Sequence, residues 1–322
     1  MKTLLHRLAS ARLMIAGFGL LAAATLWSYN VAEPPPGVIT APLALLALNL
    51  ASAIVLRPAL RRGGLGVFHL CLLALLLLAG AGRLLHFDGR VELPVGSELD
   101  GSRIEVASIG PLHGEGWRQV GFLQGPFQVD YLPGPRRTHT RSEVWLPGET
   151  AARVVGDQLP VVVDGYRFYT THNKGFAPLL TWKPQGGAPL QGVLHMPSYP
   201  GHDWKQENRW TAPDGRTVKF WLRIERPIPQ DAAWTLDPHD TPSVLIAEID
   251  GQRQELKPGD TLQLPGASLT YERLTGWMGY KIFYDPTVIP MLVVAVLGVL
   301  GLGWHLWGRS LRLLHRADEV AA

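Results

Sequence analysis

Two histidines interrupt long apolar stretches of the chain, and imidazole is a side chain that can do chemistry there. His69 lies near the start of the stretch Gly63–Gly82, and His305 lies near the end of the stretch Pro286–Gly308. Ionisable residues inside apolar spans are costly and often functional. Neutral imidazole can serve as an axial ligand of haem iron. Both positions also lie close to a span end, where an imidazole can simply reach water, so both interpretations stay open.

Two further cationic groups stand at the other end of the stretch that contains His69. Arg83 and His86 follow its last apolar residues. A guanidinium or imidazolium group there can pair with a carboxylate such as a haem propionate. The alternative is that both residues only mark the boundary between membrane and water.

Four charge-free apolar stretches must position these side chains. Each is long enough to cross a bilayer core of about 30 Å as a helix, and they cover Leu13–Ala32, Pro34–Leu56, Gly63–Gly82 and Pro286–Gly308. The sequence therefore predicts an integral membrane protein with three N-terminal spans, one C-terminal span and a large domain between the third and the fourth. Because the third span runs outward and the fourth runs inward, His69 and His305 are expected at similar depth.

The placement of arginine and lysine predicts which side each loop faces. Basic residues flank membrane helices on the cytoplasmic side, and here they gather in the leader, the second loop and the tail: Lys2, Arg7, Arg12, Arg57, Arg61, Arg62, Arg309, Arg312 and Arg316. We therefore expect both termini in the cytoplasm. The predicted organisation is a leader (1–12), a three-span segment (13–86), an outer domain (87–285), a fourth span (286–308) and a basic tail (309–322).

The charge balance argues against nucleic-acid binding. The whole chain has a formal charge of +3 and a pI near 9.0. Residues 87–285 contain 20 lysines and arginines against 24 aspartates and glutamates, so the outer domain is mildly acidic. The positive excess lies at the membrane edges, where it orients the spans, and not on a surface that could follow a phosphate backbone.

The outer domain is predicted to be mainly β. Short segments between recurrent glycines and prolines are typical of strands, and they are Val91–Leu93, Ser102–Val106, Leu159–Val163, Thr217–Ile224, Val244–Ile249 and Thr261–Leu264. The pairs Asp164-Gly165, Asp214-Gly215 and Asp250-Gly251 indicate hairpin turns. The only cysteine, Cys71, lies in the third span, so the outer domain has no disulfide.

Motifs of soluble enzymes are missing from the outer domain. The sequence has no G-x-S-x-G elbow, no H-E-x-x-H, no P-loop and no G-x-G-x-x-G. The absence of C-x-x-C and C-x-x-C-H argues against dithiol chemistry and covalent haem on this chain. The histidines of the domain are scattered, which is typical of loop or surface positions. The sequence therefore predicts no catalytic residues and no enzyme.

Several of these segments together resemble a known family. The third span and its exit, Phe68-His69-Leu70 through Gly89-Arg90-Val91 to Gly96 and Glu98, are similar to the ResB-like family of cytochrome c biogenesis proteins (System II, CcsB/ResB type). The stretch from Gly165-Tyr166 to Gly175-Phe176 and the entry Tyr284-Asp285-Pro286 to the fourth span look like family features as well. The resemblance covers the whole chain loosely, by residue type.

The resemblance implies a membrane accessory protein of c-type cytochrome maturation in the bacterial inner membrane. His69 would match the third-span histidine used in haem passage, and His305 a histidine near the end of the fourth span. The implied cargo is haem b, bound transiently. The implied partners are a tryptophan-rich multi-span protein of the ResC/CcsA type, apocytochrome c and membrane lipid. The chain would then be a non-enzymatic subunit of a haem-lyase complex.

Two departures from the family pattern leave other interpretations open. The first loop is compact, and the first span ends in Ser28-Tyr29-Asn30 where the family usually has a Gly-Thr-x-x-Pro-Gln type exit. Either a general assembly factor or a paralogue that serves one cytochrome fits this. The alternative from another class is an envelope scaffold that binds no haem. A transporter fits less well, because the spans contain no acidic residue.

Overall fold

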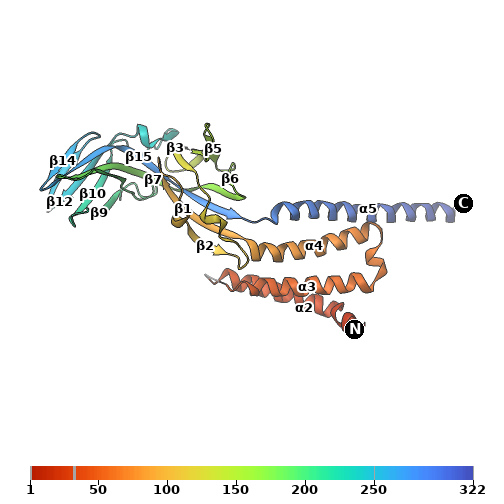
Figure 1. Ribbon diagram of the computed structural model, residues 1–322. Coiled ribbons are helices and arrows are strands. Elements are labelled where there is room, and N and C mark those ends of the chain that lie inside the picture. The colour runs from red at the N-terminus through yellow and green to blue at the C-terminus, as the bar shows by residue number, and fades with distance from the viewer. Residues whose placement is uncertain (1, 32–33, 250, 322) are drawn as a thin grey trace. The chain divides into compact units, whose positions relative to one another are not determined.

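A computed structural model describes residues 2–31, 34–249 and 251–321, and side chains within residues 3–310 of these ranges (Figure 1). Ala32 at the end of the first expected span, Glu33 of the first loop and Asp250 of one expected turn lie outside the described residues. The side chains of Lys2, Arg312 and Arg316, which entered the topology prediction, lie outside them too.

The chain divides into two compact units. The helical unit consists of Met1–Phe87, Ser108–Gly114 and Tyr284–Ala322, and the β unit consists of Asp88–Ala107 and Glu115–Phe283. The short segment Ser108–Gly114 departs from the order of the chain. That segment lies between two parts of the β unit in sequence but belongs to the helical unit.

The described residues of the helical unit form five α-helices, which are α1 (Lys2–Leu8), α2 (Ala11–Tyr29), α3 (Gly37–Leu56), α4 (Gly63–Leu85) and α5 (Val288–Ala321). In the part of the chain that the structure describes, four stretches are long and apolar enough to cross a membrane, namely Ala11–Tyr29, Gly37–Leu56, Gly63–Leu85 and Val288–Ser310. The predicted membrane-helical fold is thereby confirmed. α4 continues past the predicted end at Gly82 because Arg83, in its last turn, can extend towards water while the backbone stays helical.

The long helices pack in chain order, with α2 on α3, α3 on α4 and α4 on α5 (Figure 1). Glycines bring α4 and α5 close together. A methyl group on Gly64 would come within 2.3 Å of the Gly301 carbonyl oxygen, and one on Gly298 within 3.1 Å of Cys71 Cβ. Small residues let backbones approach closely in membrane helix pairs. The third and fourth spans are therefore neighbours.

The β unit contains three sheets built mainly from antiparallel pairs. The largest has the order β2-β1-β15-β7-β6, with β14 on β15 and β8 on β7. Its strands are β1 (Phe87–Pro94), β2 (Glu105–Ile109), β6 (Val161–Val163), β7 (Tyr166–Pro184), β8 (Leu190–Val193), β14 (Thr261–Leu264) and β15 (Ala267–Tyr284).

Two four-stranded sheets complete the β unit. One has the order β13-β12-β10-β9 and the other β11-β3-β4-β5. Their strands are β3 (Leu123–Tyr131), β4 (Arg137–Trp145), β5 (Arg153–Gly156), β9 (Glu207–Thr211), β10 (Thr217–Ile224), β11 (Trp234–Leu236), β12 (Ser243–Ile249) and β13 (Gln252–Leu256). The predicted mainly-β domain is thus confirmed.

Two very long strands, β7 and β15, lie next to each other at the centre of the largest sheet. They pair antiparallel from Ala267 opposite Pro184 to Phe283 opposite Arg167, with a bulge between Met278 and Tyr280. At this bulge, three residues of β7 lie opposite the single residue Gly279 of β15. Bulges bend a strand and redirect its side chains, and the main polar cleft of the β unit lies at this position.

Aromatic side chains fill the core of the β unit. Trp277, Tyr271, Phe168 and Phe220 are almost fully buried. The buried hydroxyl of Tyr280 donates to Gln124 Oε1 over 2.7 Å, so its polar end is satisfied inside the core. Such rings supply large buried areas, which is why the domain needs no disulfide.

Most sequence-predicted strands and turns lie where they were expected. Thr217–Ile224 and Thr261–Leu264 coincide with β10 and β14. Asp164 and Gly165 both have positive φ and join β6 to β7 in a two-residue turn. For the predicted strand Ser102–Val106, the first residue was wrong. Asp100 Oδ1 accepts the Ser102 N–H over 2.9 Å and caps a 3₁₀ turn there. Strand β2 therefore begins only at Glu105.

Candidate functional site

The imidazole of His69 is held in one tautomer by its own helix. Its Nδ1 lies 2.8 Å from the Leu65 carbonyl oxygen. A carbonyl can only accept, so Nδ1 carries a proton, and in the neutral ring Nε2 then has the lone pair. Histidines that bind metals commonly donate their other ring nitrogen to a carbonyl in this way. The half-buried His69 is therefore chemically able to offer Nε2 to an iron atom.

The two span histidines lie on different sides of α4. Val67 contacts Gly301 of α5, and Cys71 contacts Gly298. His69 is two residues from each, which places it about 200° around the helix from either contact, since successive residues turn by about 100°. His69 therefore faces away from α5.

His305 by contrast lies in the α4–α5 interface. Its backbone nitrogen would be 2.7 Å from a methyl group on Gly64. This makes His305 level with the first turn of α4, whereas His69 is level with the region between Gly298 and Gly301. The structure thus brings the two helices together without bringing the two imidazoles to one side of α4. Among the described residues, no group of three or more His, Cys, Asp or Glu side chains could hold a metal ion.

Arg83 and His86 take different roles at the C-terminal end of α4. The Arg83 side chain is exposed, so it is available to an anionic group. His86 has both ring nitrogens engaged, with Nδ1 3.0 Å from the Arg83 carbonyl oxygen and Nε2 2.7 Å from Ser108 Oγ. His86 therefore fastens a loop to the helix end and offers no free nitrogen in this arrangement.

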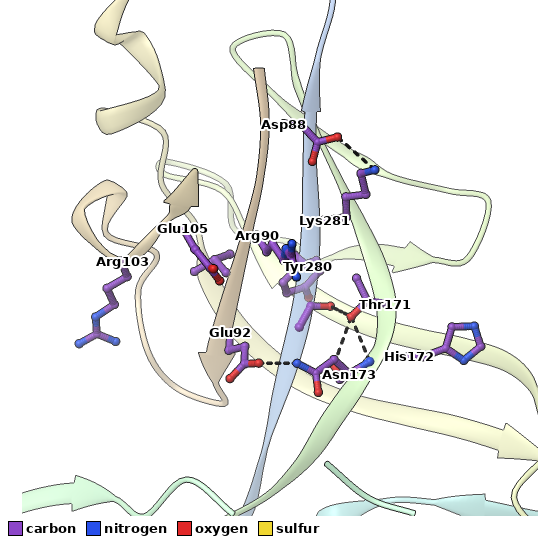
Figure 2. Close-up of a pocket in the computed structure, with 12 residues that line it drawn as sticks. Asp88, Arg90, Glu92, Arg103, Glu105, Thr171, His172, Asn173, Tyr280 and Lys281 are labelled. Atoms are coloured by element: carbon purple, nitrogen blue, oxygen red, sulfur yellow. Dashed lines mark hydrogen bonds and ion pairs between the residues drawn. The ribbon is translucent and has the colours of Figure 1, made fainter. Parts of the chain in front are cut away.

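A polar cleft of about 660 Å³ lies on the face of the largest sheet, at the bulge of β7 and β15 (Figure 2). Strands β1, β2, β7 and β15 contribute its lining, together with the turn before β2. The charged and polar side chains around it are Asp88, Arg90, Glu92, Arg103, Glu105, Thr171, His172, Asn173 and Lys281.

Glu92 is the most strongly held group of this cleft. Asn173 Nδ2 donates to its Oε1, as Figure 2 shows, and His195 Nε2 lies 2.9 Å from its Oε2. The hydrogen bond from His195, helped by its charge and by Asn173, holds the pKa of Glu92 below its ordinary value. The His195 ring stacks on buried Trp277 with centroids 4.1 Å apart. Carboxylate, imidazole and indole are thus fixed as one unit.

The remaining groups of the cleft give it a mixed charge. Lys281 Nζ pairs with Asp88 Oδ2 over 3.1 Å. Arg90 and Glu105 have no ion pair within the described part of the chain. Thr171 Oγ1 donates to the Gly279 carbonyl oxygen over 2.9 Å, and the lining contains neither serine nor cysteine. The cleft is therefore suited to holding a polar ligand that carries both charges, and it lacks an activated nucleophile.

A buried lysine lies on β7 just beyond the bulge. Lys174 is 1% exposed, and its Nζ donates to the His172 carbonyl oxygen over 3.2 Å. Burial, followed by the charge of Arg137, lowers the pKa of Lys174 to about 8. Its Nζ also lies 5.7 Å from the centre of the Tyr131 ring.

Glu92, His195 and Lys174 were not predicted from the sequence. They come together through strand pairing between distant segments, and each alone looks like a surface residue. The one usable signal is the alternation of Asp88, Arg90 and Glu92 along β1, which places them on one face of the sheet.

No protein-family model matches the chain, and no curated protein matches it at a significant level.

Proposed function

We propose that the chain is a membrane accessory protein of c-type cytochrome maturation, which works with a multi-span partner of the ResC/CcsA type to deliver haem b to apocytochrome c. The proposal rests on the likeness of the third span and its exit to the ResB-like family. The observation that carries it is the bond from His69 Nδ1 to the Leu65 carbonyl oxygen. An imidazole in an apolar span, with its tautomer fixed so that Nε2 keeps a lone pair, is a group suited to iron.

The placement of the two histidines favours a shared haem site over one within this chain. His69 faces away from α5, and His305 lies in the α4–α5 interface. A second axial ligand opposite His69 would therefore come from the partner protein. Haem would be held at the side of α4 in the leaflet near the N-terminal end of this helix, which the arginine pattern assigns to the cytoplasmic side.

The β unit would face the outside of the inner membrane, with both chain termini in the cytoplasm. Its role would be to hold the apocytochrome or the outer face of the partner. β8 and β9 are the end strands of their pairings, and an open strand edge can receive an extended segment through main-chain hydrogen bonds. We propose no catalytic residue for this chain, which would act by binding and positioning.

The first experiment replaces His69 by glycine in cells that make a c-type cytochrome. We expect haem-stained cytochrome to fall strongly while the variant accumulates in the membrane, and imidazole added to the medium to restore part of it. His305→Gly is the matched control, with a smaller expected loss because its side chain lies at a helix contact. Unchanged cytochrome in the His69→Gly strain, at normal protein level, would contradict the proposal.

The second candidate function is an envelope scaffold that binds no haem. The observation that favours it is the separation of His69 and His305 on different sides of α4. Purification of the chain from native membranes decides between the two. A Soret band that disappears in the His69→Gly sample, together with a tryptophan-rich multi-span partner, supports haem delivery. A stable complex with a different partner and no Soret band supports the scaffold.

A further inference from the structure

The segment Ser108–Gly114 is bound to the last turn of α4 through its backbone. Gly110 N–H donates to the His86 carbonyl oxygen over 2.8 Å, and Leu112 N–H donates to the Leu84 carbonyl oxygen over 2.9 Å. Gly110 is needed for this contact, because a methyl group there would lie 2.3 Å from the Leu84 carbonyl oxygen. The bonds fix the loop at the level at which the helix ends.

The same segment presents large apolar side chains to the outside. Leu112 is 65% exposed and Ile109 is 43% exposed. Pro111 between them is exposed as well. Leu112 is bonded through its backbone to Leu84, which belongs to the apolar stretch Gly63–Leu85 that is long enough to span a bilayer. Its exposed side chain therefore lies at the level of the end of that helix.

Aromatic rings surround the base of the loop. His113 stacks on Phe87 with ring centroids 5.3 Å apart and meets the edge of Tyr284 at 5.1 Å. His113 Nδ1 also lies 2.7 Å from the Leu85 carbonyl oxygen. Tyrosine rings prefer the headgroup level of a bilayer, so Tyr284 and exposed Arg83 mark where water begins.

We propose that Ser108–Gly114 is an interfacial membrane anchor that inserts the Leu112 side chain into the lipid at the C-terminal end of α4. The partner is the bilayer itself, because the exposed apolar side chains of the loop lie at the end of a helix that is long and apolar enough to cross a membrane. The proposal does not depend on haem handling. It gives the part of the chain between α4 and α5 a third point of attachment at lipid level, besides its chain connections to these two helices.

Site-directed spin labelling of the full chain in phosphatidylcholine–phosphatidylglycerol vesicles tests the anchor. The chain has one cysteine, so Cys71→Ala gives a background for single labels. Leu112→Cys is compared with Leu77→Cys in α4, 58% exposed, and with Leu159→Cys in the β unit, 61% exposed. The measurement is the ratio of collision rates with oxygen, which partitions into lipid, and with a water-soluble nickel chelate.

We expect the Leu112 label to show a several-fold higher ratio than the Leu159 label, with a value between Leu159 and Leu77. A ratio equal to that of Leu159 would overturn the proposal. Ile109→Cys gives a second measurement on the same segment in case the label at Leu112 weakens the loop. A water-like ratio at Ile109 together with normal helix content would overturn the proposal in the same way.

Discussion

The helical unit and the β unit place their apolar side chains in opposite ways. In α5, Leu292 is 64% exposed and Val299 is 71% exposed, whereas Phe168 and Phe220 of the β unit are fully buried. This difference in the exposure of apolar side chains indicates which solvent each unit needs. The β unit is stabilised by removing apolar surface from water. The helices keep that surface outside, where lipid is as apolar as leucine.

The two units also differ in what holds their elements together. Glycines at the α4–α5 contact let two backbones approach closely, while bulky buried rings fill the core of the β unit. A helix pair in lipid gains from close van der Waals contact. A sheet packing in water gains from buried aromatic area. Substitutions of the same residue type in the two units should therefore have different effects.

The largest expected difference concerns two tryptophans. Trp277 of the β unit is 1% exposed and donates to the Met196 carbonyl oxygen over 2.9 Å, whereas Trp304 of α5 is 63% exposed. We expect Trp277→Ala to lower the free energy of unfolding by about 3–5 kcal/mol, and Trp304→Ala to change it by less than about 0.5 kcal/mol. Thermal unfolding of the full chain in detergent, followed by near-UV circular dichroism, measures both. Equal losses of unfolding free energy in the two variants would contradict this difference between the two units.

The buried lysine gives the next largest effect, with a defined pH dependence. The pKa of Lys174 is about 8 in the folded chain against an ordinary 10.5, so the folded state binds fewer protons than the unfolded state between these values. Stability should therefore rise with pH between about pH 8 and 10.5. We expect Lys174→Met to stabilise the β unit by up to about 3 kcal/mol at pH 7 and to remove this rise. Urea unfolding at pH 7, 8.5 and 10 checks both, with Lys183→Met, an exposed lysine of β7, as the control. A pH slope that persists in Lys174→Met would contradict the assignment.

The third prediction concerns the close backbone contact between α4 and α5. A side chain on Gly64 would meet backbone atoms of Gly301 and His305, which cannot rotate away. We expect Gly64→Ala to weaken the α4–α5 contact by about 1–3 kcal/mol. Gly80→Ala in the same helix, with no atom within 4 Å, should be neutral or stabilising by up to about 1 kcal/mol through helix propensity. Unfolding in bicelles by added SDS measures this, and a Gly64→Ala variant as stable as Gly80→Ala would show that the contact is not close.

The smallest expected effect concerns a polar residue of the helical unit. Asn49 of α3 is buried, and its side-chain amide donates to the carbonyl oxygens of Leu8 and Ser10, which holds the turn between α1 and α2. Polar contacts within membranes are worth about 0.6 kcal/mol on average and about 1.7 at most. We therefore expect Asn49→Leu to cost about 1 kcal/mol and to raise amide hydrogen exchange in α1. Unchanged exchange there would show that α1 is held by other contacts.

The fold could be predicted well where a local pattern determines it. Length and apolar composition suffice for a membrane helix, so the four spans differ from their predicted limits by only a few residues at most ends. The exception is the C-terminal end of α5, which continues to Ala321, because no proline or glycine interrupts the basic segment after Gly308. The Asp164-Gly165 turn was predictable because both residues tolerate positive φ.

The candidate site could be predicted only in part. His69 was found because an imidazole in an apolar run stands out by itself. Its orientation could not be found, since that depends on which face of α4 carries the contacts to Gly298 and Gly301. The unit formed by Glu92 and His195 needs β1 to be placed near a loop that follows β8, and the burial of Lys174 needs the packing of Tyr131 against β7. These are long-range effects with no local signature.

The thiol of Cys71, the only cysteine in the sequence, lies against Gly298 and can therefore report on the packing of α4 against α5. The thiol is half-buried, and α5 covers part of it, so a maleimide should reach the sulfur faster when the two helices move apart. A change in the rate of alkylation in intact membranes would therefore report a change in their packing, without any engineered probe. Comparing that rate with and without the partner protein would reveal whether assembly tightens or loosens the pair.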